Sequence, residues 1–85
     1  MKTIYKYDLD VIDGIQEITM PKESIVVHTD LQNQKPTMWV LVETDNKPVM
    51  RLFTIHGTGH PIPKPERYVG TVMAPPFVWH ICEVI

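Results

Sequence analysis

A chain of 85 residues with 44% hydrophobic and 21% charged residues has the composition of one small folded domain rather than of a disordered segment. Eight Lys and Arg against ten Asp and Glu give a net charge of −2 without a basic stripe, which excludes binding to long DNA or RNA. No apolar run approaches a membrane span, and the single cysteine, Cys82, excludes an intrachain disulfide. We therefore expect a single domain over residues 1–85 in a reducing cytoplasm, without contact to a membrane.

Eight prolines divide the chain into segments too short for most helices. The segments between them are rich in Val, Ile, Thr and aromatic residues, which is typical of strands. This pattern predicts an all-β fold, either a small antiparallel sheet or a partly open barrel or sandwich of six or seven short strands. The expected strands are Thr3–Leu9, Gln16–Met20, Ile25–Leu31, Thr37–Glu43, Val49–His56, Tyr68–Val72 and Phe77–Glu83.

Turn residues lie between several of these strands. Asp13-Gly14 predicts a turn between the first two strands, and Thr44–Pro48 predicts a hairpin of the fourth and fifth, because Asp and Asn tolerate positive φ. Both faces of this hairpin are apolar, so we expect cover on both sides, from a closed barrel or from a second subunit in a homo-oligomer. In the last strand, alternation separates Phe77, Trp79 and Ile81 from Val78, His80 and Cys82.

The segment from His56 to Pro63, HGTGHPIP, is the most unusual part of the sequence. Gly57 and Gly59 allow positive φ and close approach of another group, and successive amides around Thr58 can form an anion-binding concavity. The prolines that follow would hold the loop in one conformation. There is neither a GxxxxGK[ST] motif nor a strand–loop–helix context, so no P-loop or dinucleotide fold is indicated. The alternative is a connecting loop with a purely structural turn.

Arg67 and Tyr68 follow this loop closely and add a cation and an aromatic ring. Arg67 can pair with a phosphate or carboxylate, and Tyr68 can stack on a base. The alternative is a solvated arginine beside a core tyrosine. With the loop they form the predicted ligand-binding set, which is His56, Gly57, Thr58, Gly59, His60, Arg67 and Tyr68.

The sequence evidence for a metal site or for catalytic residues is weaker than that for the ligand-binding loop. His56, His60, His80 and Cys82 would make a zinc site only if their segments met in space, so we predict no metal and no cofactor. Cys82 and His80 share a strand face and could form a thiolate–imidazole pair, although a buried, inert cysteine is the simpler interpretation. We predict no catalytic residues and favour a binding protein over an enzyme, with a histidine-assisted phosphodiesterase as the last alternative.

The order of several short motifs resembles a known group of proteins. These motifs are Gly57-Thr58-Gly59-His60-Pro61-Ile62, Tyr68-Val69-Gly70-Thr71 and Val78-Trp79-His80. The chain resembles a family of small uncharacterised proteins from bacteriophages and prophage-bearing bacteria, and the resemblance covers nearly its whole length. It implies a setting in the host cytoplasm and carries no activity or catalytic residues with it.

From the loop and this setting we expect a homo-oligomer that sequesters a small anionic, nucleotide-derived ligand and so antagonises host defence. The alternatives are an inhibitor or adaptor that binds one host protein, and a minor structural component of the virion.

Overall fold

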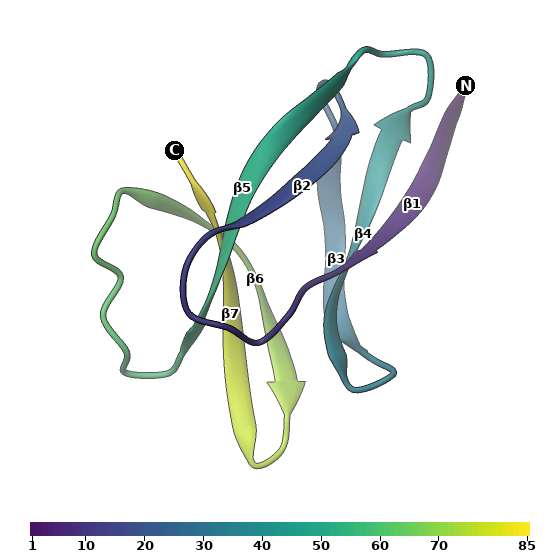
Figure 1. The fold of residues 1–85 in the computed structure, drawn as a ribbon. Coiled ribbons are helices and arrows are strands. Elements are labelled where there is room, and N and C mark those ends of the chain that lie inside the picture. The colour runs from purple at the N-terminus through teal and green to yellow at the C-terminus, as the bar shows by residue number, and fades with distance from the viewer.

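The computed structural model describes residues 1–85 as seven strands without a helix (Figure 1). The strands are β1 (Lys2–Asp8), β2 (Gln16–Pro21), β3 (Ile25–Gln32), β4 (Lys35–Glu43), β5 (Pro48–Gly57), β6 (Glu66–Ala74) and β7 (Phe77–Val84). Each predicted strand is confirmed, with its ends within two residues of the expected bounds. The protein accordingly contains no helix of the length and apolarity needed to cross a bilayer.

The strands form two antiparallel sheets that face each other as an open sandwich, not a closed barrel. One sheet has the order β1-β4-β3 and the other the order β2-β5-β7-β6. Figure 1 shows the three-stranded sheet on the right and the four-stranded sheet to its left and below. Apolar side chains from both sheets, together with one that lies just after β1, fill the space between the sheets. This core consists of Leu9, Met20, Met38, Val40, Val42, Phe53, Ile55, Val72 and Ile81.

The predicted hairpin of the fourth and fifth strands is wrong. A turn does lie between β4 and β5, where the Asn46 amide donates to the Glu43 carbonyl at 3.0 Å, but the chain there crosses from one sheet to the other. Both strands are interior strands, because β4 pairs with β1 and β3 while β5 pairs with β2 and β7. The two apolar strands therefore pack face to face across the core. Neither has an unpaired edge with which it could form hydrogen bonds to the other. The Asp13-Gly14 segment likewise connects β1 and β2 across the two sheets.

The chain forms two hairpins elsewhere, between β3 and β4 and between β6 and β7. In the first, Asn33 and Gln34 have φ of 51° and 65° and join the cross-strand partners Gln32 and Lys35. Two consecutive positive φ values are the geometry of a two-residue hairpin turn, which matches the right-handed twist of the strands. This turn could not be recognised from the sequence because it contains no glycine. The second hairpin turns at Pro75-Pro76.

The two sheets touch along one side of the sandwich, where the edge strand β3 lies against the edge strand β6. The Thr29 hydroxyl donates to the Thr71 carbonyl at 3.0 Å, and the Thr29 side chain lies against Gly70. The pairing register shifts on both strands here, between Val26 and His28 and between Tyr68 and Gly70. Such bulges bend the edge strands locally. The contact closes one side of the sandwich.

A side chain at Gly70 should disrupt this contact. A Cβ at Gly70 would lie 2.7 Å from Cγ2 of Thr29, closer than van der Waals contact permits. We expect Gly70→Ala to lower the free energy of unfolding by about 1–3 kcal/mol, the usual cost of overpacking. Urea denaturation measures this. In a Thr29→Ala background the same substitution should cost clearly less, and strictly additive effects would contradict the explanation.

Candidate functional site

The segment Gly57–His60 forms a tight turn in which each glycine has a separate role. The His60 amide donates to the Gly57 carbonyl at 3.1 Å, and Gly59 has a φ of 85° at the third position, where a type II turn requires glycine. A Cβ at Gly57 would lie 2.9 Å from ring atoms of His60. Gly57 therefore leaves space for the His60 imidazole directly against the backbone.

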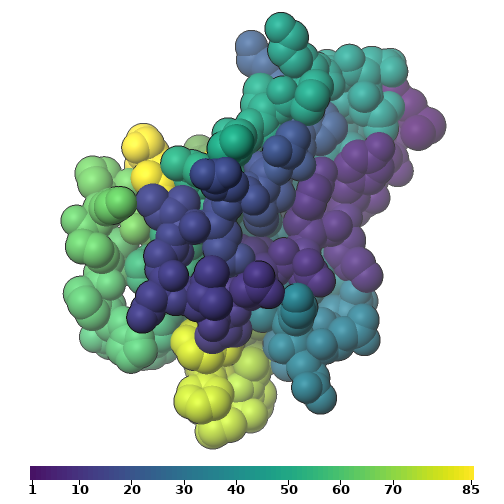
Figure 2. Space-filling view, in the orientation of Figure 1, coloured from purple at the N-terminus to yellow at the C-terminus, as the bar shows by residue number.

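Beside this turn lies a groove where β5 separates from β7. Their pairing ends at Gly57 and Trp79, although β7 begins at Phe77, so the first residues of β7 have no neighbour on the β5 side. Figure 2 shows the tip of the β6–β7 hairpin, in yellow, projecting at the foot of the molecule. The groove has a volume of about 440 Å³ and is lined by Gly57, Thr58, His60, Pro76, Phe77, Val78 and Trp79.

The groove combines aromatic surface with free polar groups. The rings of Phe77 and Trp79 stack with centroids 5.5 Å apart and an interplanar angle of 26°, and Phe77 is 57% exposed. The amide of Thr58, which lines the groove, and that of the adjacent Gly59 donate to no acceptor within the protein. A concave site with apolar walls and a few polar groups is the usual form of a small-molecule site.

The structure divides the predicted ligand-binding set. Gly57, Thr58, Gly59 and His60 lie together in the turn, whereas His56, Arg67 and Tyr68 take no part in the groove. Arg67 and Tyr68 line a different cavity, with Ser24 and Arg51, so the structure does not bring them together with the glycine turn. Phe77 and Trp79 were not predicted as groove residues, although their alternation places them on one face of the last strand.

Tyr68 and Thr58 instead hold His80. The Tyr68 hydroxyl lies 2.8 Å from His80 Nδ1, and the Thr58 hydroxyl lies 2.8 Å from His80 Nε2. Because both ring nitrogens have partners, the imidazole is fixed in orientation. The Thr58 contact ties the turn to the sheet and keeps the Gly57–His60 backbone in place beside the groove.

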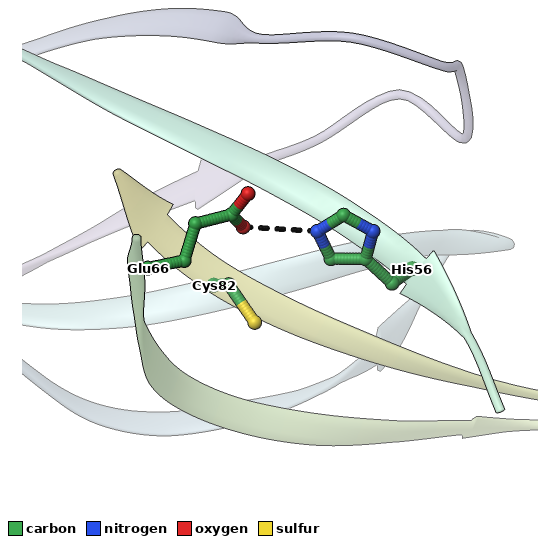
Figure 3. Close-up of side chains that lie close together, drawn as sticks. All are labelled: His56, Glu66 and Cys82. Atoms are coloured by element: carbon green, nitrogen blue, oxygen red, sulfur yellow. Dashed lines mark hydrogen bonds and ion pairs between the residues drawn. The ribbon is translucent and has the colours of Figure 1, made fainter. Parts of the chain in front are cut away.

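On the same outer face of the four-stranded sheet, His56, Glu66 and Cys82 form a cluster (Figure 3). His56 Nε2 lies 2.9 Å from Glu66 Oε1 and 3.0 Å from the Thr54 hydroxyl, which also donates to Glu66. The side chain of Glu66 is only 2% exposed, and Cys82 is buried. The four-residue set considered from the sequence is not assembled, because His60 lies with Ile55 and Trp79, residues of the opposite face.

The environment fixes the charge of these groups. Burial by itself raises the pKa of Glu66, but hydrogen bonds from Thr54 and His56 outweigh it and hold the pKa below its ordinary value. Burial, and then the charge of Glu66, raise the pKa of the Cys82 thiol. Nucleophilic catalysis needs a thiolate, so Cys82 is not an activated nucleophile in this arrangement.

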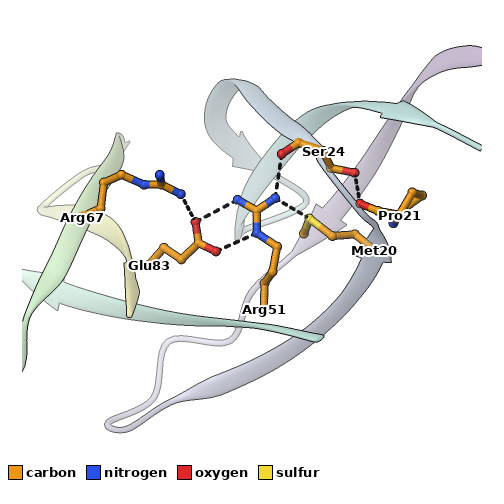
Figure 4. A network of polar contacts seen from close by, with 6 residues as sticks. All are labelled: Met20, Pro21, Ser24, Arg51, Arg67 and Glu83. Carbon is orange, nitrogen blue, oxygen red and sulfur yellow. Dashed lines mark hydrogen bonds and ion pairs between the residues drawn. The ribbon is translucent and has the colours of Figure 1, made fainter. Parts of the chain in front are cut away.

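On the inner side, Glu83 accepts hydrogen bonds from two arginines (Figure 4). Arg51 binds it through two nitrogens, at 2.6 Å and 2.8 Å, and also donates to the Ser24 carbonyl at 2.7 Å. Arg67 completes the network, although its side chain is 64% exposed. The arginine that we expected to bind a ligand is thus paired with Glu83. The hydrogen bond from Arg51 lowers the pKa of Glu83, burial opposes this, and Arg67 adds to the lowering.

A family model described as a domain of unknown function (DUF7352) matches residues 1–85. The chain belongs to the DUF7352 family. Comparison with curated proteins and with solved structures gave no match.

The two arginines of the DUF7352 network should differ in their contribution to stability. Arg51→Met leaves the buried Glu83 carboxylate without its bidentate partner, and we expect a loss of about 2–4 kcal/mol in the free energy of unfolding. Arg67→Met removes the partner that is itself largely exposed and leaves the Arg51 pair in place, so it should cost less than about 1 kcal/mol. Urea denaturation of both variants tests this, and equal losses would contradict it.

The network should also make stability depend on pH. Because the pKa of Glu83 in the folded protein lies below the ordinary 4.5, the unfolded chain binds more protons between the two values. The contribution of Glu83 is therefore complete above about pH 4.5 and is lost as the pH falls through the folded pKa. We expect wild type and Glu83→Gln to differ most near neutral pH and to converge in acid. Denaturation midpoints across a pH series measure this, with the exposed Glu17→Gln as control; a constant difference would refute it.

Proposed function

We propose that the protein is a non-enzymatic binding protein that holds a small planar anion of the nucleotide class in the groove between the Gly57–His60 turn and β7. The observation that carries the proposal is the stacked Phe77–Trp79 pair beside a turn with two unpaired amides. A flat aromatic surface next to donors without acceptors suits a ligand that has a ring at one end and a negative charge at the other.

Each part of such a ligand has a partner of matching chemistry. The base would stack on the exposed ring of Phe77, an interaction worth about 1–3 kcal/mol and tolerant of base identity. The amides of Thr58 and Gly59 would donate hydrogen bonds to the phosphate, and the His60 imidazole would supply a further donor. The volume of about 440 Å³ lies in the range of small-molecule sites.

The groove favours binding over turnover. Its only titratable side chain is that of His60, so it lacks a paired acid and base, and Cys82 lies in the separate cluster with His56 and Glu66. A ligand held there would be retained rather than converted. Because the sequence resembles proteins of bacteriophages, we propose that the protein acts in the host cytoplasm. There it would bind a nucleotide-derived defence signal and so keep the signal from its receptor.

A second candidate is binding to another protein, either a host protein or a second copy of the chain. On the outer face of the three-stranded sheet, Ile4 and Ile25 both pair with Leu41, so three apolar side chains form a row across the strands. Ile4 is 48% exposed and Ile25 is 60% exposed, and no element of the chain covers them. Exposed apolar patches of this kind are typical of interaction surfaces.

Ligand binding can be tested with the intrinsic fluorescence of the groove. Trp79 lines the groove, and Trp39 lies in the other sheet, so a Trp39→Phe variant reports on Trp79 alone. Titration with mononucleotides, cyclic mononucleotides and cyclic dinucleotides should quench this emission, and the corresponding nucleosides should bind more weakly because they lack the anion. We expect Phe77→Ala to reduce affinity about 5- to 150-fold, the equivalent of one base stack.

Controls separate this site from the one expected from the sequence. Tyr5→Ala removes an aromatic ring from the other sheet and should leave affinity unchanged, as should Arg67→Ala. Absence of binding by every nucleotide, or equal affinity for wild type and Phe77→Ala, would reject the proposal.

Native mass spectrometry of the same protein fixes the subunit count. An oligomer that carries no ligand and that dissociates in the Ile25→Lys variant would favour the second candidate.

A further inference from the structure

Three side chains of metal-ligating type converge on the outer face of the four-stranded sheet, each from a different strand (Figure 3). His56 belongs to β5, Glu66 begins β6 and Cys82 lies in β7. One ligand atom from each lies within 4.8 Å of the others. We infer that His56, Glu66 and Cys82 bind a zinc ion, a site that shares no side chain with the proposed nucleotide groove.

The dimensions of the cluster are close to those of a zinc site. Tetrahedral zinc with sulfur at about 2.3 Å and nitrogen and oxygen at about 2.0–2.2 Å requires ligand atoms about 3.3–3.6 Å apart. His56 Nε2 and Glu66 Oε1 are 2.9 Å apart, and no pair in the cluster exceeds 4.8 Å. Side-chain movements of about 1 Å therefore bring all three atoms to bonding distance. The ion would replace the present hydrogen bond between His56 and Glu66.

The fold already positions the ligands. Thr54 and Tyr68 are the cross-strand neighbours of Cys82, and His56 follows Thr54 by two residues on the same face. The Thr54 hydroxyl donates to Glu66 and would keep that contact as an outer-shell hydrogen bond to a bound ligand. Such outer-shell partners orient metal ligands and raise affinity.

Charge and burial supply an independent reason for a cation here. The Glu66 side chain is 2% exposed, and its only ion-pair partner is His56. A buried carboxylate is costly without a compensating positive charge. Zn²⁺ would balance the Glu66 carboxylate and the Cys82 thiolate together, with neutral imidazole as the third ligand, so the occupied site would carry no net charge.

The ligand set selects the kind of metal and leaves one position open. Magnesium and calcium require oxygen ligands, whereas one sulfur, one nitrogen and one oxygen suit zinc. A cavity of about 250 Å³ reaches the cluster, and its lining includes Thr54, His56, Lys64 and Glu66. Zinc with three protein ligands keeps a fourth position for water or a small anion, and the cavity provides the entry path.

Cobalt(II) is a suitable probe because it occupies zinc sites and reports on their ligands. Reduced, chelator-treated protein titrated with Co²⁺ should give a thiolate charge-transfer band that saturates at one equivalent and disappears when Zn²⁺ is added. Cys82 is the only cysteine, so the band can arise from no other residue. We expect Cys82→Ser to abolish it, and His56→Gln and Glu66→Gln each to weaken cobalt binding about 10-fold or more.

His28→Gln is the matched control, since His28 is exposed in the other sheet, and it should bind cobalt as wild type does. Circular dichroism shows which variants remain folded. Zinc should also raise the unfolding temperature of the wild-type protein, a readout that depends on no variant. Absence of a one-to-one charge-transfer band in wild type, or equal weakening by His28→Gln and His56→Gln, would overturn the inference. These outcomes do not bear on nucleotide binding.

Discussion

The pairing of β7 with β5 on one edge and β6 on the other is the constraint on which the rest of the structure depends. It places Trp79, Ile81 and Glu83 toward the other sheet and His80 and Cys82 on the outer face. Because side chains alternate with a period of two, a register slip of one residue would exchange these two sets. The core, the arginine network, the groove and the polar cluster therefore all rely on one register.

The Arg51–Glu83 pair helps to hold that register. Glu83 belongs to β7, Arg51 to β5, and the Ser24 carbonyl that Arg51 also binds lies just before β3. A slip of β7 would leave a carboxylate and a guanidinium buried without partners, which costs more than the pair itself contributes. The ion pair thus discriminates against other registers, in addition to any stability that it adds.

The strands could be predicted from the sequence because their signals are local. Prolines, β-branched residues and turn residues mark the ends of each strand, and alternation along 77–84 assigns the faces of β7. Pairing is not local, and the predicted β4–β5 hairpin failed for that reason. Two apolar strands joined by a good turn can pair edge to edge or pack face to face, and the choice depends on β1, β3, β2 and β7.

The candidate site shows the same division between local and long-range information. The turn in HGTGH was recognisable, because Gly59 has the positive φ that favours glycine. Proximity in sequence was misleading elsewhere. His56 and His60 stand four residues apart, yet the turn directs one imidazole to Glu66 on the outer face and the other toward Trp79. Gly57 makes this separation possible, because a side chain there would collide with the His60 ring and expel it from the groove.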